Sequence, residues 1–216
     1  MHRIEDEHVL SALKWQKARQ EQTRQVRADL VDHSFVTDLR FDTAVYPPEI
    51  VELSAVNWTR VFIAVMAARM LSSTDATQVL DVGSGCGKFC IAAALTCPGQ
   101  FTGIEIREDL HNVALKAAEE MGADNAHFIC GDMADLDWSE YDAYYMYNPF
   151  YGQLVQASGG EEFLRQTQIV RERLKSRPRG TRVVTHHGFG GDMPAEYERS
   201  ERHLVGAGIL ELWIRR

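Results

Sequence analysis

Two stretches of the chain carry residue types that bind nucleotides. Residues Val79 to Gly87 read V-L-D-V-G-S-G-C-G, an apolar run that leads into three alternating glycines. Glycine permits positive φ and lets the backbone approach a ligand, and a helix that starts there offers free N–H groups. A second apolar run ends at Glu105, about 20 residues beyond the turn, where a carboxylate can bind ribose hydroxyls. The two stretches together predict a nucleotide site.

The glycine spacing favours one class of nucleotide. The dinucleotide fingerprint is Gly-x-Gly-x-x-Gly, but here the third glycine, Gly87, comes one place early and Lys88 follows it. The segment Asp81 to Gly87 resembles instead Asp-x-Gly-x-Gly-x-Gly, the first motif of the class I S-adenosylmethionine-dependent methyltransferases. Three further motifs continue this similarity in order: Glu105, Gly131-Asp132-Met133 and Tyr147-Asn148-Pro149-Phe150. The resemblance covers roughly residues 78–150.

The resemblance implies S-adenosyl-L-methionine as the cofactor and gives the motif residues their roles. Asp81 would lie near the methionine ammonium, and Glu105 would accept hydrogen bonds from both ribose hydroxyls. Asp132 would face the exocyclic amine of adenine, with Met133 or Ile106 packed on the ring. The expected cofactor-binding residues are Asp81, Gly83, Ser84, Gly85, Gly87, Glu105, Ile106, Asp132, Met133 and Asn148.

The end of the fourth expected strand faces the sulfonium methyl in this family. Methyltransferases that act on planar amino groups carry Asn/Asp-Pro-Pro-Tyr/Phe there, whereas this chain has Asn-Pro-Phe, one proline short. Asn148 would accept a hydrogen bond from an amine nucleophile; the alternative is a turn residue before proline. His186 would be a general base for a hydroxyl or thiol acceptor, or else a structural residue at a strand end. The expected catalytic residues are Asn148, Tyr147 and His186.

A more distant similarity connects the chain to the non-SET histone lysine methyltransferases. Their first motif resembles Asp-x-Gly-Ser-Gly-x-Gly, followed later by Gly-x-Glu, and residues 82–88 and 103–105 are similar to these two motifs. The reaction expected of either family is an in-line displacement at the methyl carbon, in which the protein positions the nucleophile and excludes water.

Composition indicates one globular domain in a reducing compartment. The chain has 216 residues, 45% hydrophobic and 25% charged, and a formal net charge of -8, which does not favour nonspecific binding to nucleic acid. The basic stretch over 165–182 favours the solvated face of a helix and its exit loop, with a nucleic-acid patch as the alternative. The four cysteines form no C-x-x-C pair, so we expect buried thiols, no metal site and a cytoplasmic protein. No apolar run reaches transmembrane length.

The order of patterns predicts an α/β protein with a Rossmann-like methyltransferase fold: a mostly parallel seven-stranded sheet with helices on both faces and an N-terminal helical extension. We expect one or two helices over 5–31, an extended segment over 41–48 and one helix over 49–71. The other expected helices are 88–96, 108–121 and 160–177. The expected strands are 78–82, 101–106, 127–130, 143–147, 182–186 and 208–214, the last two pairing antiparallel.

The expected domains are a helical extension or lid over 1–48 and a methyltransferase domain over 49–216. The N-terminal helices are also a candidate surface for a homodimer. The leading functional hypothesis is methyl transfer to an N atom, or less readily an O atom, of a protein or small molecule. The alternatives are a non-catalytic binding subunit of the same fold, which the intact glycines and Glu105 disfavour, and a nicotinamide dehydrogenase, which Lys88 disfavours.

Overall fold

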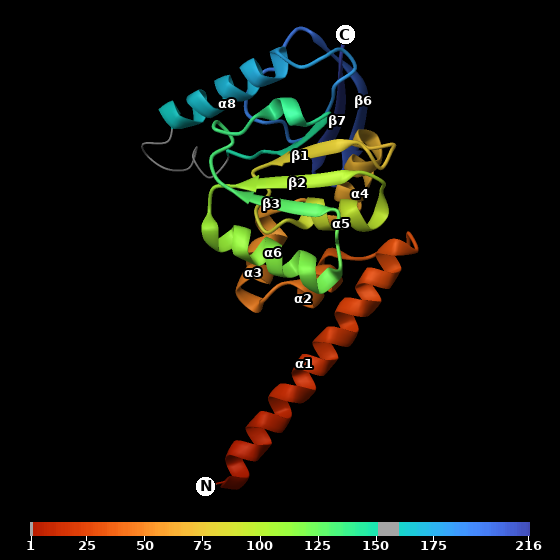
Figure 1. Ribbon diagram of the computed structural model, residues 1–216, viewed down its shortest axis with the longest axis vertical. Coiled ribbons are helices and arrows are strands. Elements are labelled where there is room, and N and C mark those ends of the chain that lie inside the picture. Colours follow the sequence, from red (N-terminus) through yellow and green to blue (C-terminus); the bar gives the residue numbers. More distant parts are fainter. Residues whose placement is uncertain (1, 151–159) are drawn as a thin grey trace.

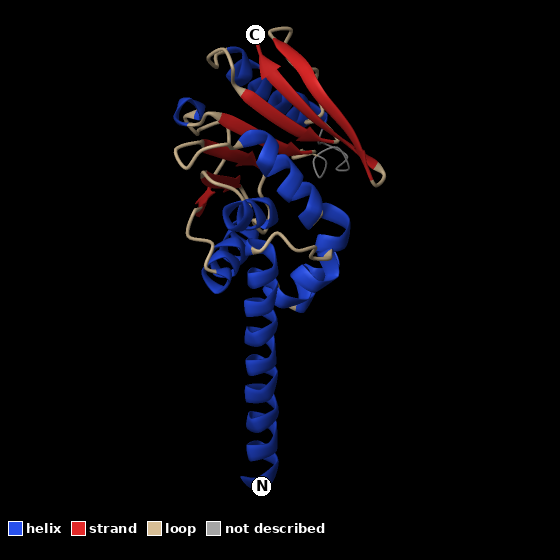
Figure 2. Cartoon of the chain, turned by 90° about the vertical axis from the view of Figure 1, so that its right-hand side faces the viewer, coloured by secondary structure: helices blue, strands red, loops and turns tan. Residues whose placement is uncertain are grey.

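A computed structural model describes residues 2–150 and 160–216 of the chain. Seven strands form one sheet in the order β3-β2-β1-β4-β5-β7-β6, with helices on both faces (Figures 1 and 2). The strands are β1 (Gln78–Val82), β2 (Gln100–Glu105), β3 (Ala126–Cys130), β4 (Ala143–Tyr147), β5 (Arg182–His186), β6 (Tyr197–Val205) and β7 (Gly208–Arg215). The predicted fold class is confirmed.

The helices divide between the two faces of the sheet. Helices α4 (Val61–Leu71), α5 (Lys88–Thr96) and α6 (Glu108–Met121) pack on one face, and α8 (Gly160–Lys175) and the short η1 (Trp138–Glu140) pack on the other. Each face has its own apolar core, because the central strands are buried on both sides. The N-terminal helices α1 (His2–Val31), α2 (Asp38–Val45) and α3 (Pro48–Asn57) extend the core around α5.

The strand register brings the motif residues to one edge. Strands β3, β2, β1, β4 and β5 are mutually parallel, and Tyr147 pairs with His186 at the ends of β4 and β5. The carboxyl ends of parallel strands meet at the same edge, which is where open α/β sheets bind ligands. Strand β7 runs antiparallel to β5, as predicted.

The predicted single helix over 49–71 is wrong. Helix α3 ends at Asn57, and α4 starts at Val61 after a short connection. The break is stabilised locally, because the Trp58 amide closes α3 on the Ser54 carbonyl and the Asp38 carboxylate accepts the Val61 amide at 2.7 Å. The buried side chains of α4 are Val61, Ile63, Ala64, Ala67, Ala68 and Leu71.

The predicted extended segment over 41–48 is also wrong for most of its length. Residues 38–45 form α2, whose N-cap Thr37 accepts a hydrogen bond from the Arg40 amide. Proline disfavours the helical conformation for the one residue before it and for none further upstream, so the extended conformation is confined to Tyr46 and Pro47, each of which precedes a proline. Strand β6, for which no range was expected, is a charged edge strand; five consecutive residues of it are exposed, so it has no alternating apolar pattern.

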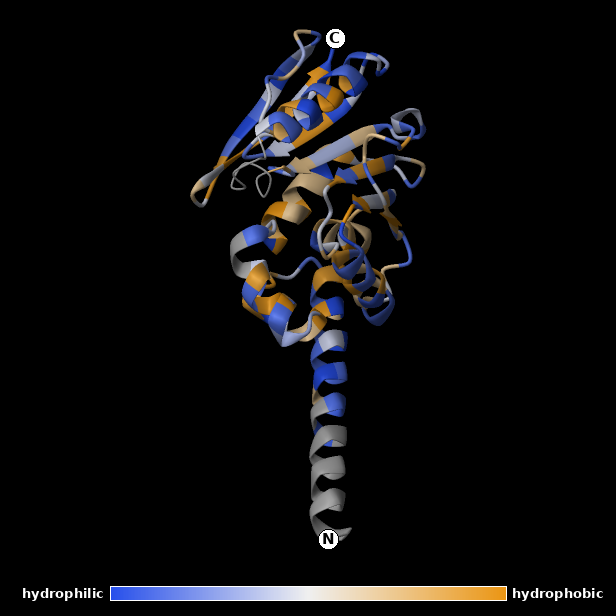
Figure 3. Ribbon diagram, turned by 90° about the vertical axis from the view of Figure 1, so that its left-hand side faces the viewer, coloured by the Kyte–Doolittle hydropathy of each residue, from blue (hydrophilic) through white to orange (hydrophobic). Residues whose placement is uncertain are grey.

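Helix α1 is one continuous helix rather than two, and it projects from the body of the protein (Figures 1 and 2). Its C-terminal part packs against the body through buried Val26 and Leu30, and the Thr23 hydroxyl donates to the Ala44 carbonyl at 2.7 Å. The described part of α1 before these contacts is mostly hydrophilic (Figure 3). Within the described ranges, no helix is both long and apolar enough to cross a membrane.

Candidate functional site

The glycine turn after β1 has a backbone that only glycine adopts without strain. Gly83, Gly85 and Gly87 have φ of +74°, +55° and +79°. Space is short as well: a Cβ on Gly87 would lie 2.6 Å from the Phe128 ring, and one on Gly85 would overlap the Trp58 indole. The turn is therefore packed between β3 on one side and the α3–α4 connection on the other.

Glu105 holds this turn in place from the end of β2. One carboxylate oxygen accepts the Gly85 amide and the other accepts the Arg107 amide, both at 2.9 Å. Each carboxylate oxygen has further acceptor capacity, so two more donors can bind. The predicted ribose-binding carboxylate is thus fixed in orientation by its own backbone contacts before any ligand arrives.

Asp81 is enclosed at the end of β1, with an exposed fraction of 4%. The Cys90 thiol donates to its Oδ2 at 3.7 Å. Burial raises the pKa of Asp81 to about 8, opposed by the Cys90 hydrogen bond and reinforced by the charge of Glu105. At neutral pH this side chain is mostly a protonated acid.

A small cavity of about 70 Å³ lies at the ends of β1, β2 and β4. It is lined by Gly83, Glu105, Ile106, Asp132, Met133 and Phe150, among others. Met133 is buried, whereas Ile106 is 63% exposed at the rim. The Asp132 carboxylate accepts the Ala134 amide at 2.9 Å and lies 3.6 Å from the Arg165 guanidinium of α8. Five of the predicted cofactor residues therefore share one cavity.

Gln166 of α8 also lines this cavity, and the sequence did not indicate it. Its amide nitrogen donates to Glu162 at 2.6 Å, which fixes the identity of the two amide atoms because a carboxylate can only accept. The remaining Oε1 is buried without a hydrogen-bond partner. A glutamine in a polar helix carries no recognisable signal, and only the packing of α8 against the sheet reveals this free acceptor.

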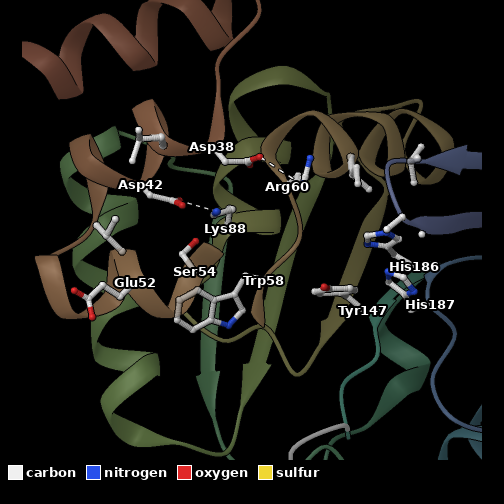
Figure 4. Close-up of a pocket in the computed structure, with 16 residues that line it drawn as sticks. Asp38, Asp42, Glu52, Ser54, Trp58, Arg60, Lys88, Tyr147, His186 and His187 are labelled. Carbon is white, nitrogen blue, oxygen red and sulfur yellow. Dashed lines mark ion pairs between the residues drawn. The ribbon is translucent and has the colours of Figure 1, made fainter. Parts of the chain in front are cut away.

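A second and larger cleft, of about 700 Å³, lies between the N-terminal helices and the ends of β4, β5 and β7 (Figure 4). Its labelled lining residues are Asp38, Asp42, Glu52, Ser54, Trp58, Arg60, Lys88, Tyr147, His186 and His187. Trp58 lines this cleft and also covers Gly85, so the glycine turn borders both cavities.

The wall of the cleft contains a buried ion pair. Lys88 Nζ lies 2.6 Å from Asp42 Oδ1, and each side chain is 3% exposed. Burial raises the pKa of Asp42, although the charge of Lys88 opposes this shift. Close by, the Tyr46 hydroxyl donates to the Cys86 carbonyl at 3.2 Å. Helix α2 is thus tied to the residues on both sides of Gly87.

Three aromatic rings form the other end of the cleft. Tyr147 stacks on His186 with centroids 4.7 Å apart, and His187 lies 4.4 Å from His186. Both ring nitrogens of His186 are buried without a partner. Burial is the main reason that the pKa of His186 falls to about 4, and the charges of His187 and Arg60 lower it further. The imidazole is therefore neutral at physiological pH.

The strand ends that carry these rings are strained. Asn148 and His187 have φ of +39° and +60°, and the Asn148 amide donates to the Gly188 carbonyl at 3.0 Å. Successive side chains of a regular strand point to opposite faces, so two consecutive histidine rings would not touch there. The left-handed backbone at His187 departs from the strand, and its ring contacts the ring of His186. Gly208 of β7 packs against both rings, since a Cβ there would lie 2.5 and 2.6 Å from their Nε2 atoms. Strain of this kind accumulates at functional sites.

The predicted site residues thus divide between two adjoining cavities. Tyr147 and His186 line the large cleft, and Gly83, Glu105, Ile106, Asp132 and Met133 line the small one. Asp81, Ser84, Gly85, Gly87 and Asn148 line neither, although all belong to β1, the glycine turn or the strand-end turn beside them. Tyr151, a further aromatic of the same motif, lies outside the described residues.

Metal chemistry has no candidate ligand set in the described part of the chain. Over residues 2–150 and 160–216, no group of three or more His, Cys, Asp and Glu side chains could hold an ion. The four cysteines are free thiols. Cys86 and Cys90 are buried as expected, but Cys97 is only partly buried and Cys130 is exposed, so the expectation of buried thiols is wrong for Cys130.

Comparison with known proteins agrees with this geometry. Residues 73–150 match a family model described as a methyltransferase domain. No curated protein matches the chain. The predicted resemblance to class I S-adenosylmethionine-dependent methyltransferases is confirmed over this segment, which contains the glycine turn, Glu105 and the Tyr147-Asn148-Pro149-Phe150 motif.

Solved structures share the fold at low sequence identity. An RNA methyltransferase from Salinibacter ruber, in complex with S-adenosyl-L-homocysteine, is 23% identical with a TM-score of 0.57, over 73% of this chain and 93% of that one. TrmN from Thermus thermophilus is 18% identical with a TM-score of 0.61, over 76% of this chain and 51% of its own, so the match spans about half of TrmN. MtNAS, in complex with MTA and tNA, is 13% identical with a TM-score of 0.53, over 91% and 71%. The predicted cofactor is consistent with these neighbours.

Proposed function

We propose that this chain, which carries a methyltransferase domain over residues 73–150, transfers a methyl group from S-adenosyl-L-methionine to an N atom of its acceptor. The observation that carries the proposal is the preset Glu105 carboxylate, held by the Gly85 and Arg107 amides at the rim of a cavity. A catalytically inactive subunit of this fold has no need to retain both the positive-φ glycines and this carboxylate, so we favour an enzyme.

The small cavity fits the adenosine end of this cofactor chemically. Glu105 would bind the ribose hydroxyls, and Ile106 and Met133 would cover the two faces of the adenine ring. The unpartnered Oε1 of Gln166 needs an N–H donor, and the exocyclic amine of adenine is one. The cavity holds about 70 Å³, less than a nucleoside requires, so we expect the exposed Ile106 side chain to move on binding.

The remaining predicted residues would serve the other end of the cofactor. Gly83, Ser84, Gly85 and Gly87 would bring the backbone close to it, and the Asp81 carboxyl would lie near its ammonium. When bound, the cofactor supplies an electrophilic methyl group on a positively charged sulfur. The aromatic face of Tyr147 stabilises positive charge near the strand end.

The residues at the ends of β4 and β5 would orient the acceptor. Asn148 would accept a hydrogen bond from the attacking amine through its side-chain carbonyl, so that the nitrogen lone pair faces the methyl group. His186 is too weak a base, with a pKa of about 4, to remove a proton from a hydroxyl efficiently. Its neutral ring can accept an N–H hydrogen bond, so we propose a positioning contact with an amine in place of general-base chemistry.

We do not extend the RNA substrate of the Salinibacter ruber neighbour to this chain. Phosphate backbones bind clusters of Lys and Arg, and the formal net charge here is -8.

Three further expectations stay predictions. They are the division into a helical extension over 1–48 and a methyltransferase domain over 49–216, the homodimer, and the cytoplasmic location. If the extension acts as a lid, Asp42 and Tyr46 are the contacts through which it would close over the glycine turn.

Isothermal titration of S-adenosyl-L-homocysteine into the purified protein tests the cofactor. We expect micromolar binding to the wild type, at least tenfold weaker binding to Glu105→Gln, and weaker still to Glu105→Ala. Glu108→Ala, an exposed glutamate three residues further on, is the matched control and should bind like the wild type. Thermal unfolding of each variant checks that it folds. Absence of binding to the folded wild type would overturn the proposal, and a parallel NADH titration tests the dehydrogenase alternative.

A further inference from the structure

The large cleft has two chemically different ends. Figure 4 shows Glu52 at one end, beyond the Trp58 indole, and Tyr147 with His186 and His187 at the other. All of these side chains line one continuous cleft of about 700 Å³, so a single elongated ligand can touch both ends. The ligand would pass along the face of Trp58.

The charges along the cleft leave one carboxylate without a partner. Asp42 is paired with Lys88 at 2.6 Å, and Asp38 lies 4.0 Å from Arg60 while it accepts the Val61 amide. Glu52 is exposed, and the described residues offer it no hydrogen bond or ion pair. Glu52 and Trp58 line the same cleft, and a carboxylate together with an aromatic face can bind an organic cation.

The opposite end favours an uncharged amine. Both nitrogens of the His186 ring are buried and unpartnered, and in the neutral imidazole one of the two can accept an N–H. Burial raises the pKa of the Tyr147 hydroxyl, but the charge of Arg60 opposes that shift, and Arg60 also contributes to the low pKa of His186. The positive charge of Arg60 therefore reaches this end, where it disfavours an ammonium and favours the neutral amine, which is the nucleophilic form.

We infer that the acceptor is an aliphatic molecule with two amino groups, one bound as an ammonium by Glu52 and Trp58 and the other presented as a neutral amine beside His186 and Tyr147. This inference rests on the proposed methyl transfer and names its substrate class. The same chemistry exists in a free diamine and in a lysine side chain of a peptide that has a second amine nearby. We expect the free diamine, because the cleft has two polar ends and a volume typical of a small-molecule site.

The methyl-transfer step balances without any further reagent. The lone pair of the neutral amine forms the new N–C bond while the C–S bond of the cofactor breaks, and its electron pair stays on sulfur. The products are S-adenosyl-L-homocysteine and a methylated ammonium, whose extra proton passes to water. The ammonium at the Glu52 end does not react and serves only to position the chain.

Binding of 1,5-diaminopentane and of 1-aminopentane, measured by calorimetry in the presence of S-adenosyl-L-homocysteine and again without it, tests the inference. We expect the wild type to prefer the diamine by about three- to tenfold, since an exposed ion pair is worth only a small factor. In Glu52→Gln this ratio should fall to about one. Glu49→Gln removes an exposed carboxylate from the same helix outside the cleft lining and should leave the ratio unchanged.

The outcomes separate this inference from the proposed function. Binding of S-adenosyl-L-homocysteine with equal affinities for the two amines would overturn the diamine and leave the cofactor assignment standing. Diamine preference without S-adenosyl-L-homocysteine binding would support the cleft assignment and overturn methyl transfer. A lysine-containing peptide that competes better than the free diamine would overturn the free small molecule as the source. With S-adenosyl-L-methionine labelled in its methyl group, transfer of radiolabel to the diamine by the wild type but not by Glu52→Gln would support the whole assignment.

Discussion

Two opposing effects act on the pKa of Asp81. Burial raises this pKa in the free protein, whereas the ammonium of a bound cofactor would lower it. With a pKa of about 8, Asp81 holds a proton at pH 7, whereas a bound ammonium favours the carboxylate. Binding of S-adenosyl-L-homocysteine should therefore release close to one proton at pH 7. The affinity should rise with pH up to about 8 and then level off. Calorimetry at pH 7 in two buffers of different ionisation enthalpy measures the proton count.

The matched control for this prediction is Asp81→Asn, which has a similar shape and no ionisable group. Its binding heat should be independent of the buffer and its affinity independent of pH. A wild type with the same heat in both buffers would show that Asp81 does not ionise on binding.

Gln166 should make the site selective for adenine. Its free Oε1 accepts a hydrogen bond from an amine but would oppose the carbonyl of a 6-oxopurine, leaving both acceptors unpaired. The wild type should therefore bind S-adenosyl-L-homocysteine at least tenfold more tightly than S-inosyl-L-homocysteine. Gln166→Leu should reduce that ratio several-fold in competitive titrations. The control is Gln168→Leu, an exposed position two residues further along α8, which should leave the affinity ratio unchanged. An unchanged ratio in Gln166→Leu would show that another residue selects adenine.

At the residue scale, the sequence predicted those site residues whose positions depend on the local backbone conformation. The three glycines and Glu105 belong to a turn whose φ values and hydrogen bonds depend on local order, so their spacing predicted them. Trp58 and Gln166 take their positions from packing between segments far apart in the chain. No pattern around either residue records that packing, so only the structure could reveal them.

At the scale of elements, the Lys88–Asp42 pair connects α5 to α2. Removing one partner leaves a buried charge without compensation, so Lys88→Met should destabilise the fold by about 3–5 kcal/mol. The double variant Lys88→Met/Asp42→Leu should recover much of this loss, since neither charge then remains. Denaturant unfolding of the wild type and the three variants completes the cycle. Lys116→Met, which removes an exposed partner of Glu120, should change stability by less than about 1 kcal/mol.

The core elements were predictable and the N-terminal helices were not, for a physical reason. Helices α5 and α6 have the predicted ends, because a glycine turn or a strand end precedes each of them. Around residues 38–61, by contrast, helix ends depend on long-range contacts, such as the Asp38 carboxylate on the Val61 amide. Prolines 47 and 48 suggested an extended segment, although a proline also fits the first turn of a helix, as in α3.

At the scale of the whole molecule, Asp81 and His186 act on stability in opposite directions. The pKa of Asp81 is raised on folding, so its contribution is complete below its unfolded pKa of 3.8 and is lost as pH rises through 8. The pKa of His186 is lowered from 6.5 to about 4, so its contribution is lost as pH falls from 6.5 through 4. Between pH 4 and 6.5 the slopes of these two groups largely cancel, and above 6.5 the slope of Asp81 is no longer offset by His186.

The free energy of unfolding should therefore fall by about 1 to 1.5 kcal/mol between pH 6.5 and 8. The full slope of about 1.4 kcal/mol per pH unit is not reached, because histidine in the unfolded chain and Asp81 in the folded protein are each half titrated at one end of this interval. Chemical denaturation at both pH values measures this difference. In Asp81→Asn the difference should disappear, and in His186→Gln it should persist. A decline of equal size in Asp81→Asn would assign the effect to other groups.

The projecting helix α1 has a consequence for hydrodynamics. Thirty helical residues span about 45 Å, and the first part of this length stands clear of the body (Figures 1 and 2). A rod on a sphere diffuses more slowly than a sphere of the same mass. A monomer of 24.4 kDa should thus elute early in gel filtration, at a volume that suggests a dimer. Light scattering is insensitive to this shape and separates an elongated monomer from two associated chains.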